Sequence, residues 1–416
     1  MMDVVVLGVG AAGNKAVVSL MENGIIDTDH AKLLNTSVKD LPERYVNEAG
    51  LYIQIPGNMQ GAGKEYTRGR SLMVNSIRNR DIDLASFIDQ DTKEVILVSS
   101  VEGGTGSGSV PVIASYYDAM NVPVHVFAFI GFQDEARGMN NTLKFFKDLP
   151  SNVILHTIRN SYFLDYTKNY SIAEQAANKE FCTEVEILRG SKIIPSEQNI
   201  DDMDLYKINT TSGYMTINHI PLNNIKNTDG FNAAVAAAFE NSCYMDCDHS
   251  IKRLAVVINA SKDICKYVDN KFEVVQRYVG TPFEIFQHIQ YDGNEEYVDI
   301  LGCGLNYPSR PIKDVSNKYN KIKENLNTGL KTFDDIFSDI EIDDCDNQFG
   351  TQIRQVVDPA KVDAMFGAQD IKSMAKAVSA VKHEKNTTEP VKSPIQQDAK
   401  KQSGEIIENV ETVEAY

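Results

Sequence analysis

Three short glycine-rich segments near the N-terminus have the composition of phosphate-binding turns. They read GVGAAGN at residues 8–14, GAGK at 61–64 and GGTGSG at 103–108. Successive backbone N–H groups in such turns form an anion-binding concavity, and the N-terminus of a following helix adds its dipole. Three such turns that face one crevice can wrap a triphosphate, so we expect a nucleotide site there.

The third turn is the most informative. Glycine loses more backbone freedom on folding than any other residue, so the glycine-rich run VEGGTGSGSV at 101–110 needs a reason. The run lacks the GxxxxGK[ST] pattern, which excludes a P-loop here. Thr105 and Ser107 are sized to donate hydroxyl hydrogen bonds to phosphate oxygens. Tight packing or a surface turn explains a single glycine-rich turn, whereas three in register favour phosphate binding.

The first turn also fits another chemistry. GVGAAG matches the GxGxxG fingerprint of dinucleotide-binding proteins, in which an acidic residue further along the chain binds the ribose. Asp27 and Asp29 lie near the spacing at which that residue is expected. An NAD-dependent Rossmann oxidoreductase is therefore an alternative, although it leaves the third turn without a role.

The elements that must position these turns alternate along the chain. Strand-like apolar runs lie at residues 4–7, 32–34, 52–55, 95–99 and 124–130. A helix is expected at 14–23, and a helix-like run starts at Pro111. This alternation predicts an α/β fold with a mostly parallel, doubly wound sheet. Ligands of such sheets bind beyond the carboxyl ends of the strands, which is where the turns lie.

A long helix and a second, smaller α/β unit follow. Residues 171–190 predict one mostly buried helix with an apolar face made of Ile172, Ala176, Phe181, Val185 and Leu188. Strand-like runs at 253–258 and 296–301, with helix-like runs at 232–240 and 268–279, predict the smaller unit. A charged amphipathic helix is expected at 312–340. Residues from 383 onward lack the apolar surface needed to offset their ordering entropy, so we expect disorder there.

Composition limits the class of protein. The chain has 416 residues, 42% of them hydrophobic, which is enough for a sizeable core. Its net charge of −17 argues against a broad nucleic-acid footprint. No apolar run approaches the roughly 18 residues of a membrane span, and the cysteines form no CxxC pair. We expect a soluble, cytoplasmic protein that makes no contact with a membrane.

The order and spacing of these motifs resemble a known superfamily. GVGAAGN, Asn35-Thr36, GAGK and EGGTGSG are similar to the nucleotide loops of the tubulin/FtsZ superfamily of GTPases. The third loop resembles the family signature GGGTG[ST]G, with Glu102 in place of the first glycine. We expect the Glu102 side chain to point outward. Within the superfamily, NTS at 35–37, GKE at 63–65 and NKEF at 178–181 are most similar to the TubZ branch of phages and plasmids.

The resemblance implies a set of site residues. For GTP or GDP binding they are Gly10, Ala11, Ala12, Gly13, Asn14, Asn35, Thr36, Gly61, Ala62, Gly63, Lys64, Gly103, Gly104, Thr105, Gly106, Ser107, Gly108, Glu135, Arg137, Asn160 and Asn178. Glu135 and Arg137 match the ribose loop. Asn160 and Asn178 match guanine-reading positions, since an amide both donates and accepts; surface or helix-end asparagines are the alternative. Lys64 either adds a cation at the phosphates or is solvated.

A second motif matches the family's catalytic loop. NIDDMDL at 199–205 is similar to the pattern NxDxxD[VL] of FtsZ, which implies that Asp201 and Asp204 are catalytic. The alternative is an acidic helix start, in which carboxylates interact with the helix dipole. In the family this loop completes the site of the next subunit, and Mg²⁺ accompanies the nucleotide. No side chain of this chain is assigned as a metal ligand.

The resemblance also implies the domain organisation. It gives a GTP-binding domain over residues 1–170, a central helix over 171–193, an activation domain with the catalytic loop over 194–308 and a C-terminal helix over 309–343. A mostly flexible tail over 344–416 follows, with a candidate docking helix at 359–383.

The implied function is a GTP-hydrolysing, head-to-tail filament that segregates or positions plasmid or phage DNA in a bacterial cell. A DNA-binding adaptor of the TubR kind would grip the tail, so that DNA is contacted only indirectly. An FtsZ-like cell-division GTPase is the alternative within the superfamily, and a relative that binds nucleotide and caps filaments without hydrolysis is a further one.

Overall fold

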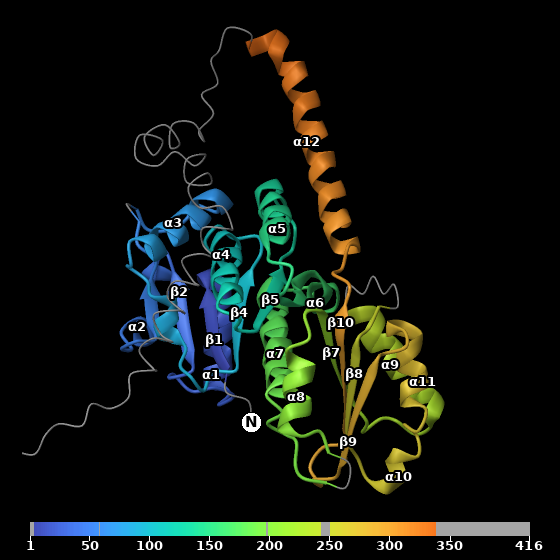
Figure 1. Cartoon of the computed structure of the whole chain (residues 1–416). Helices are drawn as coiled ribbons and strands as arrows, with labels where there is room; N and C mark the ends of the chain where they lie inside the picture. The colour runs from blue at the N-terminus through green and yellow to red at the C-terminus, as the bar shows by residue number, and fades with distance from the viewer. Residues whose placement is uncertain (1–3, 58, 197–198, 243–249, 338–416) are drawn as a thin grey trace, which may run out of the picture.

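One continuous ten-stranded sheet runs through the molecule, as the computed structural model shows (Figure 1). The structure describes residues 4–57, 59–196, 199–242 and 250–337. The strands are β1 Val4–Val9, β2 Ala31–Asn35, β3 Tyr52–Gln54, β4 Glu94–Ser100, β5 Val124–Ile130, β6 Ile154–Arg159, β7 Gly213–Pro221, β8 Arg253–Asn259, β9 Glu284–Gln290 and β10 Tyr297–Leu305. Their order in the sheet is β3-β2-β1-β4-β5-β6-β7-β10-β8-β9. The predicted α/β class is confirmed.

Helices cover both faces of this sheet. They are α1 Gly10–Glu22, α2 Glu43–Val46, α3 Tyr66–Arg78, α4 Thr105–Ala119, α5 Ala136–Asp148, α6 Asn160–Thr167, α7 Tyr170–Leu188, α8 Asp202–Asn209, α9 Thr228–Ser242, α10 Lys262–Cys265, α11 Lys271–Val279 and α12 Arg310–Phe337. One apolar core lies beneath α3, α4, α5, α9 and α11. The other lies beneath α1, α6, α7 and α8. Strands β4 and β5 are therefore covered on both faces, which accounts for their unbroken apolar sequences.

The two halves of the sheet differ in strand direction. The strands from β3 to β6 are parallel to their neighbours. Strand β7 is parallel to β6 but pairs with it only at Ile154–Gly213 and Leu155–Tyr214. Strand β10 is antiparallel to both β7 and β8. The second unit is thus a mixed extension of the first sheet, and the strands diverge where the two halves join.

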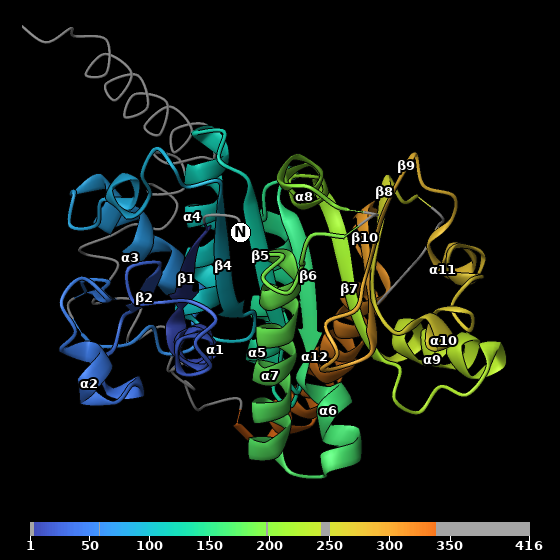
Figure 2. The same cartoon turned by 90° about the horizontal axis from the view of Figure 1, so that it is seen from below.

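Helix α7 spans the join between the halves. Figure 2 shows it between α1 and the strands of the second half. Its buried residues include Ala173, Ala177, Phe181, Val185 and Leu188. The predicted apolar face was wrong at its first position, because Ile172 is half exposed. Ala176 is half-buried and packs against the core beside the buried Ala173 and Ala177.

Several boundaries and elements differ from the sequence prediction. Helix α1 begins at Gly10 rather than at residue 14, and α4 begins at Thr105 rather than at Pro111. The glycines therefore form the first helical turns and not only the loops before them. Strands β7 and β9 were not predicted, since their polar side chains interrupt the apolar pattern.

The C-terminal helix is present as α12, and its first turns pack near α5, with Lys318 Nζ donating to Gln133 Oε1 at 3.0 Å. The predicted tail at 344–416 and docking helix at 359–383 lie outside the described residues. Among the helices that the structure describes, none has the length and apolar character needed to cross a membrane.

Candidate active site

The predicted phosphate turns meet at the carboxyl edge of the first half of the sheet. Thr36, directly after β2, and Thr105, at the start of α4, share a hydrogen bond between their hydroxyl oxygens at 2.7 Å. The N–H of Gly61 donates to the carbonyl oxygen of Thr36 at 3.0 Å. A Cβ on Gly10 would lie 3.0 Å from the amide nitrogen of Gly106. Loops from four places in the sequence therefore touch one another here.

Close packing explains most glycines of the third turn. A Cβ on Gly104 would lie 2.5 Å from the backbone nitrogen of Glu65, and one on Gly106 would lie 2.7 Å from the carbonyl oxygen of Val9. A Cβ on Gly108 would overlap the backbone of α3. Gly103 differs, because a Cβ there meets nothing within 4 Å. Gly103 thus leaves the turn open toward solvent, while the other glycines allow α4 to approach α3 and β1.

The side chains of this turn lie inside it. Thr105 is 8% exposed and Ser107 is fully buried, with its Oγ donating to the carbonyl oxygen of Gly103. The Ser107 hydroxyl is therefore already used within the turn, whereas Thr105 faces Thr36. In the first turn, Gly13 and Asn14 are buried, Ala11 is half-buried and Ala12 is exposed.

A buried asparagine that the sequence analysis missed joins the second and third turns. Asn141, on α5, donates from Nδ2 to the carbonyl oxygens of Lys64 and Glu102, each at 2.9 Å. It is 2% exposed. A polar residue on the buried face of an amphipathic helix is the only sequence signal that marks it.

Glu102 does not point outward, and that prediction was wrong. Its Oε1 accepts a hydrogen bond from the N–H of Gln133 at 3.0 Å. Its side chain occupies the space beside Gly131 and Gly138, where a Cβ would meet it. Burial raises the pKa of the Glu102 carboxyl, with the hydrogen bond from Gln133 acting in the opposite direction. The residue that departs from the family signature therefore supports the loop between β5 and α5.

The predicted ribose loop faces the second turn. Lys64 Nζ lies 2.8 Å from Glu135 Oε1, and both side chains are at least half exposed. Arg137 Nη1 donates to the carbonyl oxygen of Gly63 at 3.5 Å. Lys64 is thus paired with a carboxylate in this structure, and an ion pair so exposed contributes little to stability.

Three predicted site asparagines lie on helices α1, α6 and α7. Asn14 is fully buried and its amide has no hydrogen-bond partner among the described residues; the same holds for Oδ1 of Asn160, the first residue of α6. Asn178 lies one turn before Cys182, whose Sγ lies 3.6 Å from Ser19 Oγ of α1. Asn178 therefore faces α1. Unsatisfied buried amide atoms are costly, so Asn14 and Asn160 fit a polar ligand that supplies the missing partners.

The acidic loop leads into α8, and its Asp201 and Asp204 carboxylates are at least partly exposed. Asp201 caps α8, since its Oδ1 accepts from the N–H of Asp204 at 2.8 Å. Asp204 is half-buried and lies 3.8 Å from Lys207 Nζ. Asp201 is exposed, and the neighbouring Met203 is 62% exposed. Asp201 is thus an acidic helix cap, as the alternative interpretation expected. Capping uses one carboxylate oxygen and leaves Asp201 exposed, so it does not exclude the catalytic interpretation.

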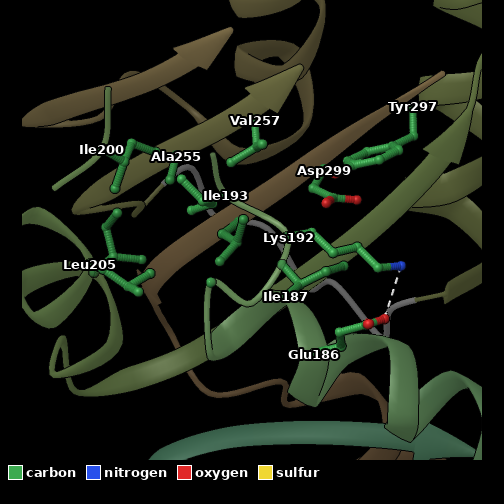
Figure 3. Close-up of a pocket in the computed structure, with 13 residues that line it drawn as sticks. Glu186, Ile187, Lys192, Ile193, Ile200, Leu205, Ala255, Val257, Tyr297 and Asp299 are labelled. Carbon is green, nitrogen blue, oxygen red and sulfur yellow. Dashed lines mark ion pairs between the residues drawn. The ribbon is translucent and has the colours of Figure 1, made fainter. Parts of the chain in front are cut away.

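Apolar neighbours anchor this loop. Figure 3 shows Ile200, Leu205 and Ile193 at one end of a small cavity of about 20 Å³, under the strands of the second half. Ile200 and Leu205 are each 6% exposed. A cavity of this size holds about one water molecule, so the anchoring side chains are closely packed. At its other end Lys192 pairs with Glu186 at 2.9 Å.

The two predicted halves of the site lie at opposite ends of the molecule. Helix α7 begins near the carboxyl edge that holds the glycine turns, and its 19 residues extend for about 28 Å. Its far end contacts the segment that follows α1, where Arg189 Nη1 donates to the carbonyl oxygen of Ile25. Asp201 and Asp204 follow that end. They are therefore remote from the glycine turns of their own chain.

The dinucleotide alternative does not fit this geometry. Asp27 and Asp29 precede β2, whereas a ribose-binding acid follows the second strand at its carboxyl end. Asp27 instead pairs with His30 at 2.6 Å.

Comparison with protein families matches residues 3–167 to the GTPase domain of the tubulin/FtsZ family. These residues form a tubulin/FtsZ-family GTPase domain. This match covers the part of the chain that carries the predicted glycine turns.

Individual relatives agree with this assignment. The cell division protein FtsZ of Aquifex aeolicus is 24% identical over 328 residues, which cover 76% of this chain and 86% of that protein. Among solved structures, the TubZ of Clostridium botulinum phage c-st is 18% identical, with a TM-score of 0.60 over 78% of this chain and 98% of its own. CetZ2 from Haloferax volcanii, a GTPγS-bound protofilament, is 18% identical and has a TM-score of 0.63. The match covers 78% of this chain and 100% of the CetZ2 chain. The GTPase domain and the second half thus share the fold of all three groups.

Proposed function

We propose that this GTPase assembles head to tail and hydrolyses GTP at the interface between subunits. The observation that carries the proposal is the placement of the acidic loop, which is anchored by Ile200 and Leu205, points outward and lies at the pole opposite its own glycine turns. A heterologous contact of this kind joins the two ends of successive subunits and generates an open filament. The related CetZ2 forms such a protofilament in its GTPγS-bound structure, which supports the proposal.

The glycine turns would hold the nucleotide. The open backbone at Gly103 and the hydroxyls of Thr36 and Thr105 suit the phosphates, and Asn160 and Asn178 suit the guanine. No group of three or more His, Cys, Asp or Glu side chains in the described part of the chain is placed to hold a metal ion. Mg²⁺ would therefore enter with the phosphates, as it commonly does, keeping water among its ligands.

The chemistry follows from positioning. Phosphoryl transfer needs alignment and charge stabilisation more than covalent catalysis. Asp201 and Asp204 of the adjacent subunit would orient and polarise the attacking water, while backbone N–H groups of the turns hold the γ-phosphate. A lone subunit lacks these carboxylates at its own site, so assembly activates hydrolysis. Loss of the γ-phosphate then removes contacts that favour the filament.

The cellular role we propose is movement or positioning of plasmid or phage DNA in the bacterial cytoplasm. The similarities of NTS, GKE and NKEF to the TubZ branch support this role. The DNA would be held through an adaptor of the TubR kind on the tail, and the net charge of −17 disfavours direct DNA binding by the body. An FtsZ-like role in division is the second candidate, because the FtsZ relative covers a similar share of the chain.

Electron microscopy of the purified full chain with GTP, GDP and a slowly hydrolysed analogue tests the assembly. We expect filaments with GTP and longer-lived filaments with the analogue. GTPase activity per subunit should rise across the assembly threshold. A constant specific activity, or the absence of filaments with either triphosphate, would contradict the proposal.

A further inference from the structure

A second cavity, separate from the glycine turns, lies where the two halves of the sheet diverge. It has a volume of about 290 Å³. Its walls come from the end of β6 and from α6 on one side, from α7, and from β7 and α9 on the other. It exists because β6 and β7 pair only at their first residues and separate beyond them. Neither the phosphate turns nor the acidic loop lines it.

Two glutamates of α7 line this cavity. Glu180 and Glu184 are one helical turn apart and therefore lie on one face of the helix. Glu184 is only 9% exposed, and Glu180 is half-buried. Neither carboxylate makes a hydrogen bond or an ion pair with any residue that the structure describes. An ionised carboxylate in such a place is costly unless something neutralises it.

The charged groups around the cavity form no ion pair with either glutamate among the described residues. His219 of β7 is paired with Asp299 behind it, with 2.7 Å between Nδ1 and Oδ1. Arg159 supplies one positive charge and lies over the Tyr162 ring, 5.9 Å from its centroid. Burial raises the pKa of both glutamate carboxyls. The charge of Glu180 adds to the rise at Glu184, whereas His219 and Lys179 act in the opposite direction at Glu180. Among the described residues, no cation forms an ion pair with Glu184, the more deeply buried of the two glutamates.

The remaining walls indicate what kind of cation fits. Tyr162 and Tyr166 stand at the α6 side with their rings 5.6 Å apart, and aromatic faces attract cations. Ala237 and Ala238 of α9 form an apolar wall opposite. A bare metal ion is disfavoured, because the described residues contain no cluster of three His, Cys, Asp or Glu groups placed to hold one. The volume is also much larger than a single ion needs.

We propose that this cavity is a binding site for a small organic cation, an amine or ammonium compound, whose charge is held by Glu184 and Glu180 and whose carbon skeleton packs on the tyrosines and alanines. Such a ligand would contact α6 and α7 on one side and β7 and α9 on the other. The proposal does not depend on filament assembly or on the position of the nucleotide.

Binding can be measured on the full chain with four defined probes. They are butylammonium, choline, putrescine and spermidine chlorides, each at fixed ionic strength, with 1-butanol as the neutral analogue of the first. We expect at least one cation to bind saturably by calorimetry and to raise the melting temperature, and 1-butanol to do neither. Saturable binding should be at least about tenfold weaker in Glu184→Gln and in Glu180→Gln, since each removes a buried countercharge.

Two variants distinguish binding in this cavity from non-specific attraction of cations to a protein with a net charge of −17. Glu174→Gln removes an exposed carboxylate of the same helix and should leave binding unchanged. Ala237→Trp keeps both glutamates but fills the cavity from its exposed wall, and it should abolish binding. The proposal is overturned if no probe binds, if Glu184→Gln binds as well as the wild type, or if Ala237→Trp retains full affinity.

Discussion

At the scale of residues, Gly103 and Gly106 show two different reasons for glycine in one turn. Gly106 lies against β1 and β4, and any side chain there meets the carbonyl oxygen of Val9. Gly103 meets no protein atom within 4 Å of an added Cβ. Gly106 is therefore required by the fold, whereas Gly103 leaves space for a ligand.

This difference predicts opposite outcomes for two substitutions. Gly103→Trp should leave the melting temperature nearly unchanged and abolish GTP binding, because the side chain fills the space above the turn. Gly106→Ala should lower the free energy of unfolding by about 1–3 kcal/mol through overpacking. Thermal melts and nucleotide titration of both variants check this. Normal GTP affinity in Gly103→Trp would show that the phosphates lie elsewhere.

The acidic loop allows a substitution that separates capping from catalysis. Asp201→Ala would remove the cap of α8 as well as the charge, whereas asparagine caps a helix as well as aspartate does. We expect Asp201→Asn and Asp204→Asn to bind GTP normally and to reduce turnover by about 100-fold or more. Steady-state hydrolysis and GTP titration give the two readouts. Weaker GTP binding with unchanged turnover of bound GTP would argue against a role in trans.

Some site residues were predictable and others were not. The contact of Thr36 with Thr105 agrees with the motif order, because the carboxyl ends of β2, β1 and β4, which are parallel, lie at one edge of the sheet. Asn141 was missed because a single buried amide has no spacing pattern. The direction of the Glu102 side chain was predicted wrongly. Its hydrogen-bond partner, the N–H of Gln133, belongs to a loop whose path the sequence does not specify.

At the scale of elements, strands β4, β5 and β6 carry a line of buried polar side chains. Glu94 Oε2 lies 3.0 Å from His125 Nε2, and His125 Nδ1 lies 2.9 Å from His156 Nε2. All three residues are at most 1% exposed. His156 also stacks on Phe127, with ring centroids 4.2 Å apart. Burial, with the neighbouring His125 as a smaller cause, holds the pKa of His156 well below 6.5.

The buried His156 predicts that the folded protein becomes less stable in acid. Below pH 6.5 the unfolded chain binds a proton at His156 that the folded protein does not, so the free energy of unfolding falls as the pH falls. The contribution is up to about 1.4 kcal/mol per pH unit. Denaturant titrations between pH 7.5 and pH 5.5, at a single ionic strength, measure it; these limits bracket the ordinary pKa of about 6.5.

His156→Phe, which can keep the stack on Phe127, should reduce the slope of stability against pH. Equal slopes in the wild type and His156→Phe would contradict the assignment.

Elements with strong apolar patterns were predicted well, and partly polar ones were not. Strand β5 was predicted at its observed bounds, because all seven of its residues are buried. Strand β9 lies at the edge of the sheet and has only two buried residues, so its alternation is weak. The starts of α1 and α4 were placed too late, since glycine is unfavourable in helices and only tertiary contacts keep it there.

At the scale of the whole molecule, the continuous sheet and α7 act as a spacer between two poles. One pole carries the glycine turns of the GTPase domain, and the other carries Asp201 and Asp204. The sequence indicated both motifs but not the distance between them, which depends on the direction of α7 and on its packing against α1. On the proposed mechanism, this separation makes a single subunit incomplete as a catalyst.

Mixing two inactive variants tests this incompleteness most directly. Gly103→Trp keeps the acidic loop and lacks nucleotide binding, whereas the double variant Asp201→Asn/Asp204→Asn binds GTP and lacks the acids. Cosedimentation of tagged variants must first show that both enter the same filaments. In a random mixed filament, about a quarter of the interfaces join a GTP-bearing subunit to an acid-bearing one. We predict that hydrolysis, negligible in each variant alone, returns to about that fraction of wild-type activity in the cosedimenting mixture; activity no greater than the sum of the two separate variants would contradict catalysis in trans.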